Sequence, residues 1–160
     1  MKKKILLVNP ENFSLSYGDV RFVRFLTKKS GGILNATLPT IAALTPDEFE
    51  VDVVDEKLES INFAEKYDIV GITAIVTQFG RAIEIAQEFS KRGSLVVCGG
   101  SSVSLSPERW RPYADVLIIG EAERIWPQFL EDYLLGEYKK EYHETERFDL
   151  SISPVPDYSH

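Results

Sequence analysis

Five short runs of apolar residues, spread between positions 5 and 119, constrain this chain more than any other feature. Each run is rich in valine and isoleucine. None alternates with polar residues in the way typical of a strand that has one solvent-exposed face. Unbroken runs of this kind are typical of strands covered on both faces, and therefore of a parallel sheet. The runs are Ile5–Asn9, Val51–Asp55, Ile69–Thr73, Leu95–Cys98 and Val116–Ile119.

Helical patterns separate these runs. An apolar stripe at helical spacing covers Phe79–Phe89, and Gly93 is a typical helix stop beyond it. A second stripe covers Ile125–Leu134 and is closed by Gly136. Shorter helices are predicted over Leu38–Leu44 and Pro107–Tyr113. Strands that alternate with helices predict an α/β fold, here a flavodoxin-like (Rossmann-like), doubly wound, five-stranded parallel sheet of order 2-1-3-4-5.

Composition excludes several classes of function. The 25 acidic residues outnumber the 18 basic ones and give a formal charge of −7, which disfavours nucleic acid and anionic membranes as partners. No stretch approaches the roughly 20 apolar residues of a membrane span. Cys98 is the one cysteine, so an intrachain disulfide is impossible and a cytoplasmic location is expected. The plain interpretation of Cys98 is a small buried hydrophobic residue.

The length of 160 residues suits one domain with a sizeable core, predicted over residues 1–136. Residues 11–35 form an insertion after the first strand, in which Phe22 and Phe25 stand among basic residues. This segment is either an amphipathic surface helix followed by a flexible turn, or a lid or docking element over the site. Residues 137–160 are polar and rich in tyrosine and proline, which predicts a linker.

Small and polar residues follow four of the predicted strands. In a doubly wound sheet, ligands bind outside the carboxyl ends of the strands, where the strand order reverses. Here that point lies between the first and third strands. The candidate site residues are Asn9 and Pro10 after the first strand; Thr73, Ala74, Ile75, Val76, Thr77 and Gln78 at the third; Gly99, Gly100, Ser101 and Ser102 at the fourth; and Gly120 and Glu121 after the fifth.

Each of these features also has a structural interpretation. Gly99 and Gly100 suit a tight turn as well as a close approach of ligand to backbone. The Thr73 hydroxyl can satisfy its own backbone, and Gly120 and Glu121 can cap a helix. Their convergence on one edge predicts a slot of small residues and hydroxyls, with almost nothing for proton chemistry. Such a slot suits a bulky, mostly apolar ligand tail.

Familiar phosphate motifs are absent from the first loop. Asn9-Pro10-Glu11-Asn12 contains neither a dinucleotide fingerprint nor a P-loop, and it lacks the serines, threonines and glycines of a flavodoxin phosphate loop. The aspartate pair and the lysine of a phospho-accepting receiver domain are missing as well.

An ordered set of motifs carries a resemblance to a known family. The motifs are KILLVNP at 4–10, YDIVGITA at 67–74, RGSLVVCGG at 92–100, VSLSPE at 103–108, ADVLIIGEAE at 114–123 and PVP at 154–156. With these motifs, nearly the whole chain resembles the N-terminal cobalamin-binding domain of the cobalamin-dependent radical S-adenosylmethionine enzymes. The resemblance implies a cobalamin-binding module, serving methyl transfer or a related reaction.

The resemblance also implies where cobalamin lies. The nucleotide tail would enter a slot lined by Thr73, Gly99, Gly100 and Ser101, with Gly120 nearby. The corrin ring would lie across the strand ends, over Asn9, Pro10 and residues 75–78. Other cobalamin domains ligate cobalt through the histidine of a D-x-H-x-x-G loop after the first strand. Here that loop has none, and the two histidines, His143 and His160, are expected to be solvated tail residues. We therefore expect the base to be displaced from cobalt with no protein histidine replacing it, and no metal ligand from this chain.

The family's radical step needs a C-x-x-x-C-x-x-C motif for an iron–sulfur cluster, and this chain holds only Cys98. The chain alone is therefore not expected to be catalytic. S-adenosylmethionine and the cluster are expected in a radical domain, in cis after residue 160 or in trans, with Phe22 and Phe25 as candidate contacts to it. The alternative is a non-catalytic α/β regulatory domain that binds another small ligand or a partner protein. Colour after reconstitution with cobalamin distinguishes the two.

Overall fold

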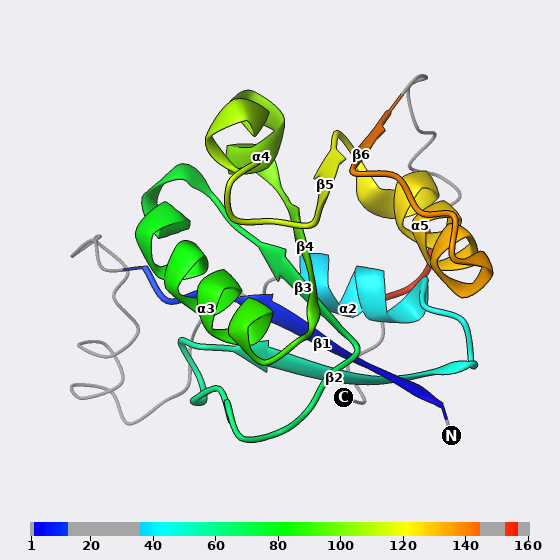
Figure 1. Cartoon of the computed structure of the whole chain (residues 1–160), viewed down its shortest axis with the longest axis horizontal. Coiled ribbons are helices and arrows are strands. Elements are labelled where there is room, and N and C mark those ends of the chain that lie inside the picture. The colour runs from blue at the N-terminus through cyan, green and yellow to red at the C-terminus, as the bar shows by residue number, and fades with distance from the viewer. Residues whose placement is uncertain (1, 13–35, 145–152, 157–160) are drawn as a thin grey trace.

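A six-stranded parallel sheet forms the centre of the computed structural model, which describes residues 2–12, 36–144 and 153–156 (Figure 1). The strand order is β2-β1-β3-β4-β5-β6. The strands are β1 (Lys3–Asn9), β2 (Phe49–Asp55), β3 (Ile69–Thr73), β4 (Leu95–Gly99), β5 (Val116–Ile119) and β6 (Glu141–His143). The doubly wound fold and its order 2-1-3-4-5 are thus confirmed, and the sheet gains one further strand.

The sixth strand differs from what the sequence predicts. Glu141–His143 falls in the segment predicted to be a linker, yet it pairs in parallel with β5, with Tyr142 opposite Ile118. Three residues with one apolar member give no strand pattern. The strand is held by its neighbours, because Tyr142 packs against α5 and donates a hydrogen bond to Asp132 (2.7 Å). The sheet therefore extends beyond residue 136.

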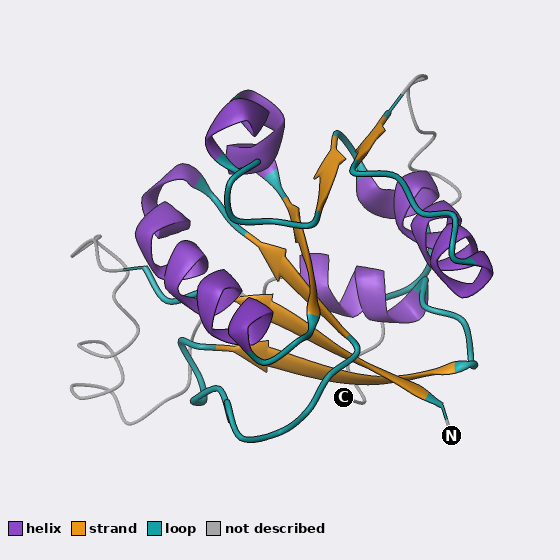
Figure 2. Cartoon of the chain, in the orientation of Figure 1, coloured by secondary structure: helices purple, strands orange, loops and turns teal. Residues whose placement is uncertain are grey.

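Helices cover both faces of the sheet (Figure 2). Helices α2 (Thr37–Ala43) and α5 (Ala122–Leu135) pack on one face, and α3 (Phe79–Lys91) and α4 (Ser101–Leu105) lie on the other. Two short 3₁₀ turns, η1 (Val76–Gln78) and η2 (Pro107–Arg109), complete the connections. The predicted helix over Pro107–Tyr113 is only the η2 turn followed by a loop, whereas α4 had no apolar stripe to predict it.

Two apolar clusters, one on each face, form the core. The α3 face contains Phe89, Cys98 and Trp110, all with no exposed surface. The α5 face contains Ile5, Val97 and Phe129 among others. Alternate residues of each strand enter opposite clusters, which explains why the strands are apolar on both faces.

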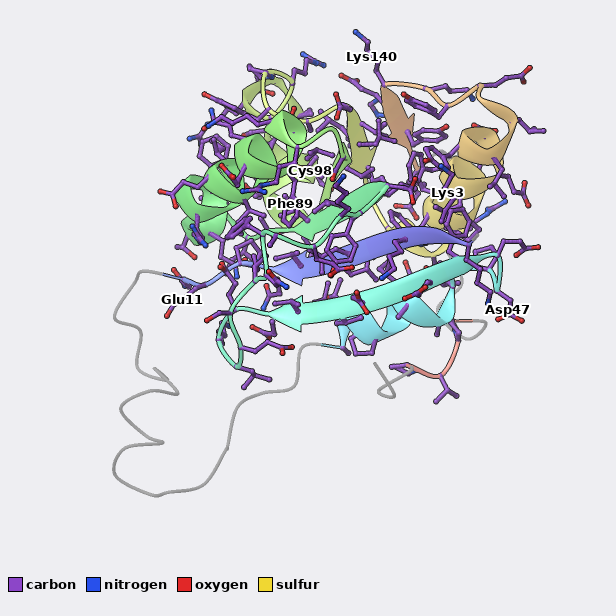
Figure 3. The ribbon with its side chains drawn as sticks, turned by 60° about the horizontal axis from the view of Figure 1, so that its bottom comes forward. Lys3, Glu11, Asp47, Phe89, Cys98 and Lys140 are labelled. Carbon is purple, nitrogen blue, oxygen red and sulfur yellow. The ribbon has the colours of Figure 1, made fainter. Side chains whose placement is uncertain are left out.

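All six strands point the same way, so their carboxyl ends meet at one edge. Figure 3 shows Glu11 at the end to which the arrowheads of β1 and β2 point and Lys3 at the opposite end. Among the described residues, no helix is both long and apolar enough to cross a membrane. Most of the insertion, including Phe22 and Phe25, lies outside the described residues, as do residues 145–152 and His160.

Candidate functional site

A cavity of about 810 Å³ opens at the carboxyl edge, on the sheet face that α2 and α5 cover. The sheet forms one wall of this cavity, and the register of the strands places the lining residues of that wall in two rows. The deep row, Leu7, Gly71 and Val97, lies at the middle of β1, β3 and β4. The upper row lies one pleat nearer the edge and consists of Asn9, Thr73, Gly99 and Ile118.

The two rows differ in chemistry. The deep row is apolar, and the helix residues that face it are Leu38 and Ile41 of α2 and Trp126 of α5. The hydroxyls and carboxylates of the lining come from the strand ends and the adjoining helices, and belong to Thr37, Thr40, Thr73, Ser101, Ser104, Glu121 and Glu123. A ligand that fits this cavity has an apolar inner end and a polar outer end.

Two strand glycines, Gly71 and Gly99, lie in the wall of the cavity and have different neighbours. A Cβ atom at Gly71 would lie 2.9 Å from Leu7 Cδ2 and 3.4 Å from Trp126 Cη2. A Cβ at Gly99 would stand 3.6 Å from Ile118 Cβ, within ordinary contact. A larger side chain at Gly99 would therefore extend into the cavity, whereas Leu7 and Trp126 already occupy the space over Gly71.

The turn after β4 requires glycine for another reason. Gly100 has φ +92°, and a Cβ there would lie 2.9 Å from both Ala74 O and Thr73 Oγ1. The same turn is joined to β3 by hydrogen bonds from Ala74 N to Gly99 O and from Ser102 N to Ala74 O, both 3.1 Å long. The backbone of this wall is therefore held close to the third strand.

Ser104 joins two glycine turns at the open end. Its hydroxyl donates to Gly100 O (3.2 Å) and accepts a hydrogen bond from Gly120 N (3.0 Å). Opposite, Glu144 packs over Gly120 and accepts a hydrogen bond from Glu121 N (3.2 Å). These contacts fix the spacing between the ends of β4 and β5.

Gln78 fixes the loop after β1. Its amide nitrogen donates to Asn9 Oδ1 (3.0 Å) and to Pro10 O, and its amide oxygen accepts from Ile75 N (2.9 Å). Asn9 donates in turn to Asp55 (3.0 Å). Both amides are buried, and this hydrogen bonding gives them a positioning role in the floor below the strand ends.

An ion pair supports the same loop. Arg81 binds Glu56 at 2.7 Å, and Glu56 accepts a hydrogen bond from Glu11 N (3.0 Å). Glu56 N also donates to Asn9 O (3.0 Å). The side chain of Glu56 is 8% exposed, and its carboxylate raises the pKa of the Arg81 guanidinium. Residues 9–11 are thus held in one conformation.

The rim of the cavity is unusually apolar for a surface. Ile75, Val76 and Leu105 are 51%, 55% and 73% exposed and lie at the ends of β3 and α4. Exposed apolar side chains gathered beside a cavity are typical of a surface that a large apolar ligand or another domain covers.

The cavity brings together most of the predicted site residues. Those lining it are Asn9, Thr73, Ala74, Ile75, Gln78, Gly99, Gly100, Ser101, Gly120 and Glu121. Four others do not line it. Val76 and Thr77 are exposed in η1, Pro10 accepts the bond from Gln78, and Ser102 is buried in α4.

The sequence patterns did not predict the wall of the cavity that helices α2 and α5 form. Thr37, Leu38, Thr40 and Ile41 of α2 line the cavity, as does Trp126, which the sequence assigns to an ordinary apolar stripe. The one available signal was Gly71, a glycine inside an otherwise β-branched run, which often marks close approach of another group.

The described residues offer little catalytic chemistry. Within residues 2–12, 36–144 and 153–156, no three His, Cys, Asp or Glu side chains are grouped to hold a metal ion. Burial raises the pKa of the Cys98 thiol, and Cys98 faces the α3 cluster, away from the cavity. His143 contacts Glu141 (3.3 Å) and, by strand alternation with Tyr142, points away from the cavity face. The arrangement can bind and orient a ligand.

An open parallel sheet with a cavity at its carboxyl edge defines a small-molecule-binding domain of the doubly wound class. The chain belongs to the B12 binding domain family, whose model matches residues 36–130. Cobalamin is the ligand that this membership implies.

Two curated relatives come from Chlorobaculum tepidum. The bacteriochlorophyllide d C-8(2)-methyltransferase is 38% identical over 111 residues, 69% of this chain and 25% of that protein. The bacteriochlorophyllide d C-12(1)-methyltransferase is 25% identical over 162 residues, 99% of this chain and 33% of that protein. The chain therefore matches only a quarter to a third of these relatives' lengths. A solved structure, the N-terminal domain of the hypothetical protein TM0182 of Thermotoga maritima, is 21% identical, with a TM-score of 0.45, covering 74% of this chain and 96% of that one.

Proposed function

We propose that this chain is the cobalamin-carrying module of a radical S-adenosylmethionine methyltransferase. Two similar proteins are methyltransferases by name, and the cavity at the carboxyl edge supports a binding role. In this proposal, S-adenosylmethionine and an iron–sulfur cluster belong to another domain, in cis or in trans. Bound cobalamin would supply a methyl carrier, since its cobalt accepts and donates a methyl group.

The residues present fit cobalamin. The carrying observation is the cavity of about 810 Å³, lined by Gly99 and Gly100 and bordered by the exposed side chains of Ile75, Val76 and Leu105. Its size lies within the range of about 300–1,000 Å³ that small-molecule sites occupy. Thr73, Gly99, Gly100 and Ser101 would hold the nucleotide tail. The apolar rim and the fixed loop at Asn9 and Pro10 would support the corrin ring.

We also propose that no side chain of the residues that the structure describes would ligate cobalt from below. Asn9 and Gln78 are held in hydrogen bonds with Asp55, Pro10 and Ile75. His143 points away from the cavity. A nucleotide tail inside the slot keeps its own base from the metal. A weak lower ligand favours easy transfer of the methyl group.

The test is an absorption titration of the purified chain with hydroxocobalamin, followed by desalting. We expect a protein-bound spectrum at about one cobalamin per chain. Gly99→Leu, whose side chain would fill the slot at an ordinary backbone conformation, is expected to abolish retention, as is Gly100→Leu. Gly80→Leu is the matched control, because Gly80 faces open space on α3. Absence of retained cobalamin in the wild type would contradict the proposal and favour a regulatory domain with another ligand.

A second measurement tests the proposal that no nitrogen ligates cobalt from below. An electron paramagnetic resonance spectrum of the reduced Co(II) form is expected to lack nitrogen superhyperfine splitting. Splitting from one nitrogen would show that a base or an imidazole ligates cobalt, while leaving cobalamin binding intact.

A further inference from the structure

We infer that Glu144, directly after β6, is a positioning residue that holds the turn after β5 in place at the cavity, so that β6 is part of the binding unit. The ligand in this inference rests on the proposed binding of cobalamin, whereas the contacts do not. Strand β6 (Glu141–His143) lies beyond residues 36–130, which the B12 binding domain model matches, and none of its residues lines the cavity. Neither observation accounts for the presence of this strand.

Side-chain contacts anchor β6 beside β5 (Figure 1). Tyr142 is 4% exposed, and its ring packs against Phe129 with 5.9 Å between the ring centroids. Its hydroxyl donates to Asp132 (2.7 Å) and accepts a hydrogen bond from Lys139 N (3.0 Å). Since Asp132 and Phe129 belong to α5, this helix fixes the strand that follows it.

The residue after β6 contacts a turn that lines the cavity. Glu144 N donates to Ile119 O (2.9 Å), which places Glu144 beside Gly120 and Glu121. Its carboxylate accepts a hydrogen bond from Glu121 N (3.2 Å). A Cβ atom at Gly120 would lie 2.6 Å from Glu144 Cβ, so the two residues are in close contact. Gly120 and Glu121 line the cavity, and Glu144 supports them from outside it.

The turn depends on its neighbours for its conformation. Gly120 has φ +105°, and a glycine has other conformations of similar energy. The side chain of Glu121 makes no capping hydrogen bond at the start of α5. Ser104 accepts from Gly120 N (3.0 Å) on one side, and Glu144 accepts from Glu121 N on the other. Loss of Glu144 is therefore expected to free the turn without unfolding the sheet.

Glu144→Ala and Glu144→Gln test the contact. Alanine removes the acceptor, so the amide proton of Glu121 is expected to exchange with solvent about threefold to tenfold faster, the factor that corresponds to one hydrogen bond. The affinity for hydroxocobalamin is expected to fall by a similar factor. The amide oxygen of glutamine can still accept from Glu121 N, so Glu144→Gln is expected to recover most of both losses. A merely structural role for the charge would give no such recovery.

Two further variants locate the effect. Glu137→Ala is the matched control, because Glu137 is exposed in the connection between α5 and β6 and its replacement removes the same charge. It is expected to alter neither measurement. Tyr142→Phe removes only the hydroxyl that anchors β6, and it is expected to change both measurements in the same direction as Glu144→Ala.

Unchanged exchange at Glu121 in Glu144→Ala would overturn the inference whether or not cobalamin binds. Faster exchange with unchanged affinity for hydroxocobalamin would overturn it as well, because the turn would then move without consequence for the ligand. Failure of the proposed function is distinct: the wild-type chain would then retain no cobalamin, and the exchange measurement would still decide whether Glu144 holds the turn.

Discussion

The two faces of the sheet use the same strands in different ways. On the α3 face, Phe89, Cys98 and Trp110 fill the space completely. On the α5 face, Gly99 interrupts the apolar surface at the carboxyl edge, and a cavity of about 810 Å³ opens there. Both faces carry a buried apolar cluster, and the α5 face carries the candidate binding site as well. The difference teaches that the site is made by omitting side chains from an otherwise ordinary core.

The largest effect is expected on the filled face. Phe89 has no exposed surface and touches the rings of Phe63 and Tyr67. Phe89→Ala would remove a whole buried ring and is expected to lower the free energy of unfolding by about 3–5 kcal/mol. Urea denaturation measures it. A loss below about 1 kcal/mol would mean that this face is not closely packed.

A sharper comparison uses neighbouring residues of β4. Val96 enters the α3 cluster and Val97 lines the cavity. Val96→Ala is expected to lower the free energy of unfolding by about 2–3 kcal/mol, because a new void adds to the lost burial. Val97→Ala is expected to lower it by only about 1.5 kcal/mol, since Val97 borders an existing cavity and its truncation creates less new void. Equal losses in urea denaturation would contradict the distinction between the faces.

The loop beside the cavity offers a smaller test. Arg81→Met would leave the nearly buried carboxylate of Glu56 without its cation, and we expect a loss of about 1–2 kcal/mol in the free energy of unfolding. Arg92→Met is the matched control, because it breaks a more exposed ion pair with Glu88 (2.7 Å) and is expected to cost no more than about 0.5 kcal/mol. Thermal denaturation compares the two. Equal effects would show that the Glu56 pair does not hold the loop.

The smallest effect depends on pH. Burial raises the pKa of the Cys98 thiol above its ordinary value of 9.0, so the native state keeps a proton that the unfolded state loses. This contribution to stability is present below pH 9 and is lost as the pH rises above it. We expect the stability advantage of the wild type over Cys98→Ala to shrink by about 1 kcal/mol between pH 8 and pH 10. An unchanged difference in urea denaturation would indicate an accessible thiol.

The local pattern of apolar residues was enough to predict most of the fold. Each of the five predicted strands appears within two residues of its expected ends, because an unbroken run of valine and isoleucine has few alternatives to a buried parallel strand. The edge that carries the site followed from the strand order. The glycines after β4 and β5 followed from that edge, and both Gly100 and Gly120 have a positive φ.

The sequence by itself determined the doubly wound sheet, the edge that carries the cavity, and the lack of a histidine in the loop after β1. Only the tertiary structure decided the depth of the cavity, the wall formed by α2, the position of Trp126 over Gly71, and the sixth strand. The physical reason is how far apart along the sequence the interacting residues are. A strand or helix is encoded by the spacing of neighbouring residues, whereas a cavity exists only where distant segments meet and leave space between them. Likewise, Glu141–His143 becomes a strand because β5 offers an open edge and α5 holds Tyr142.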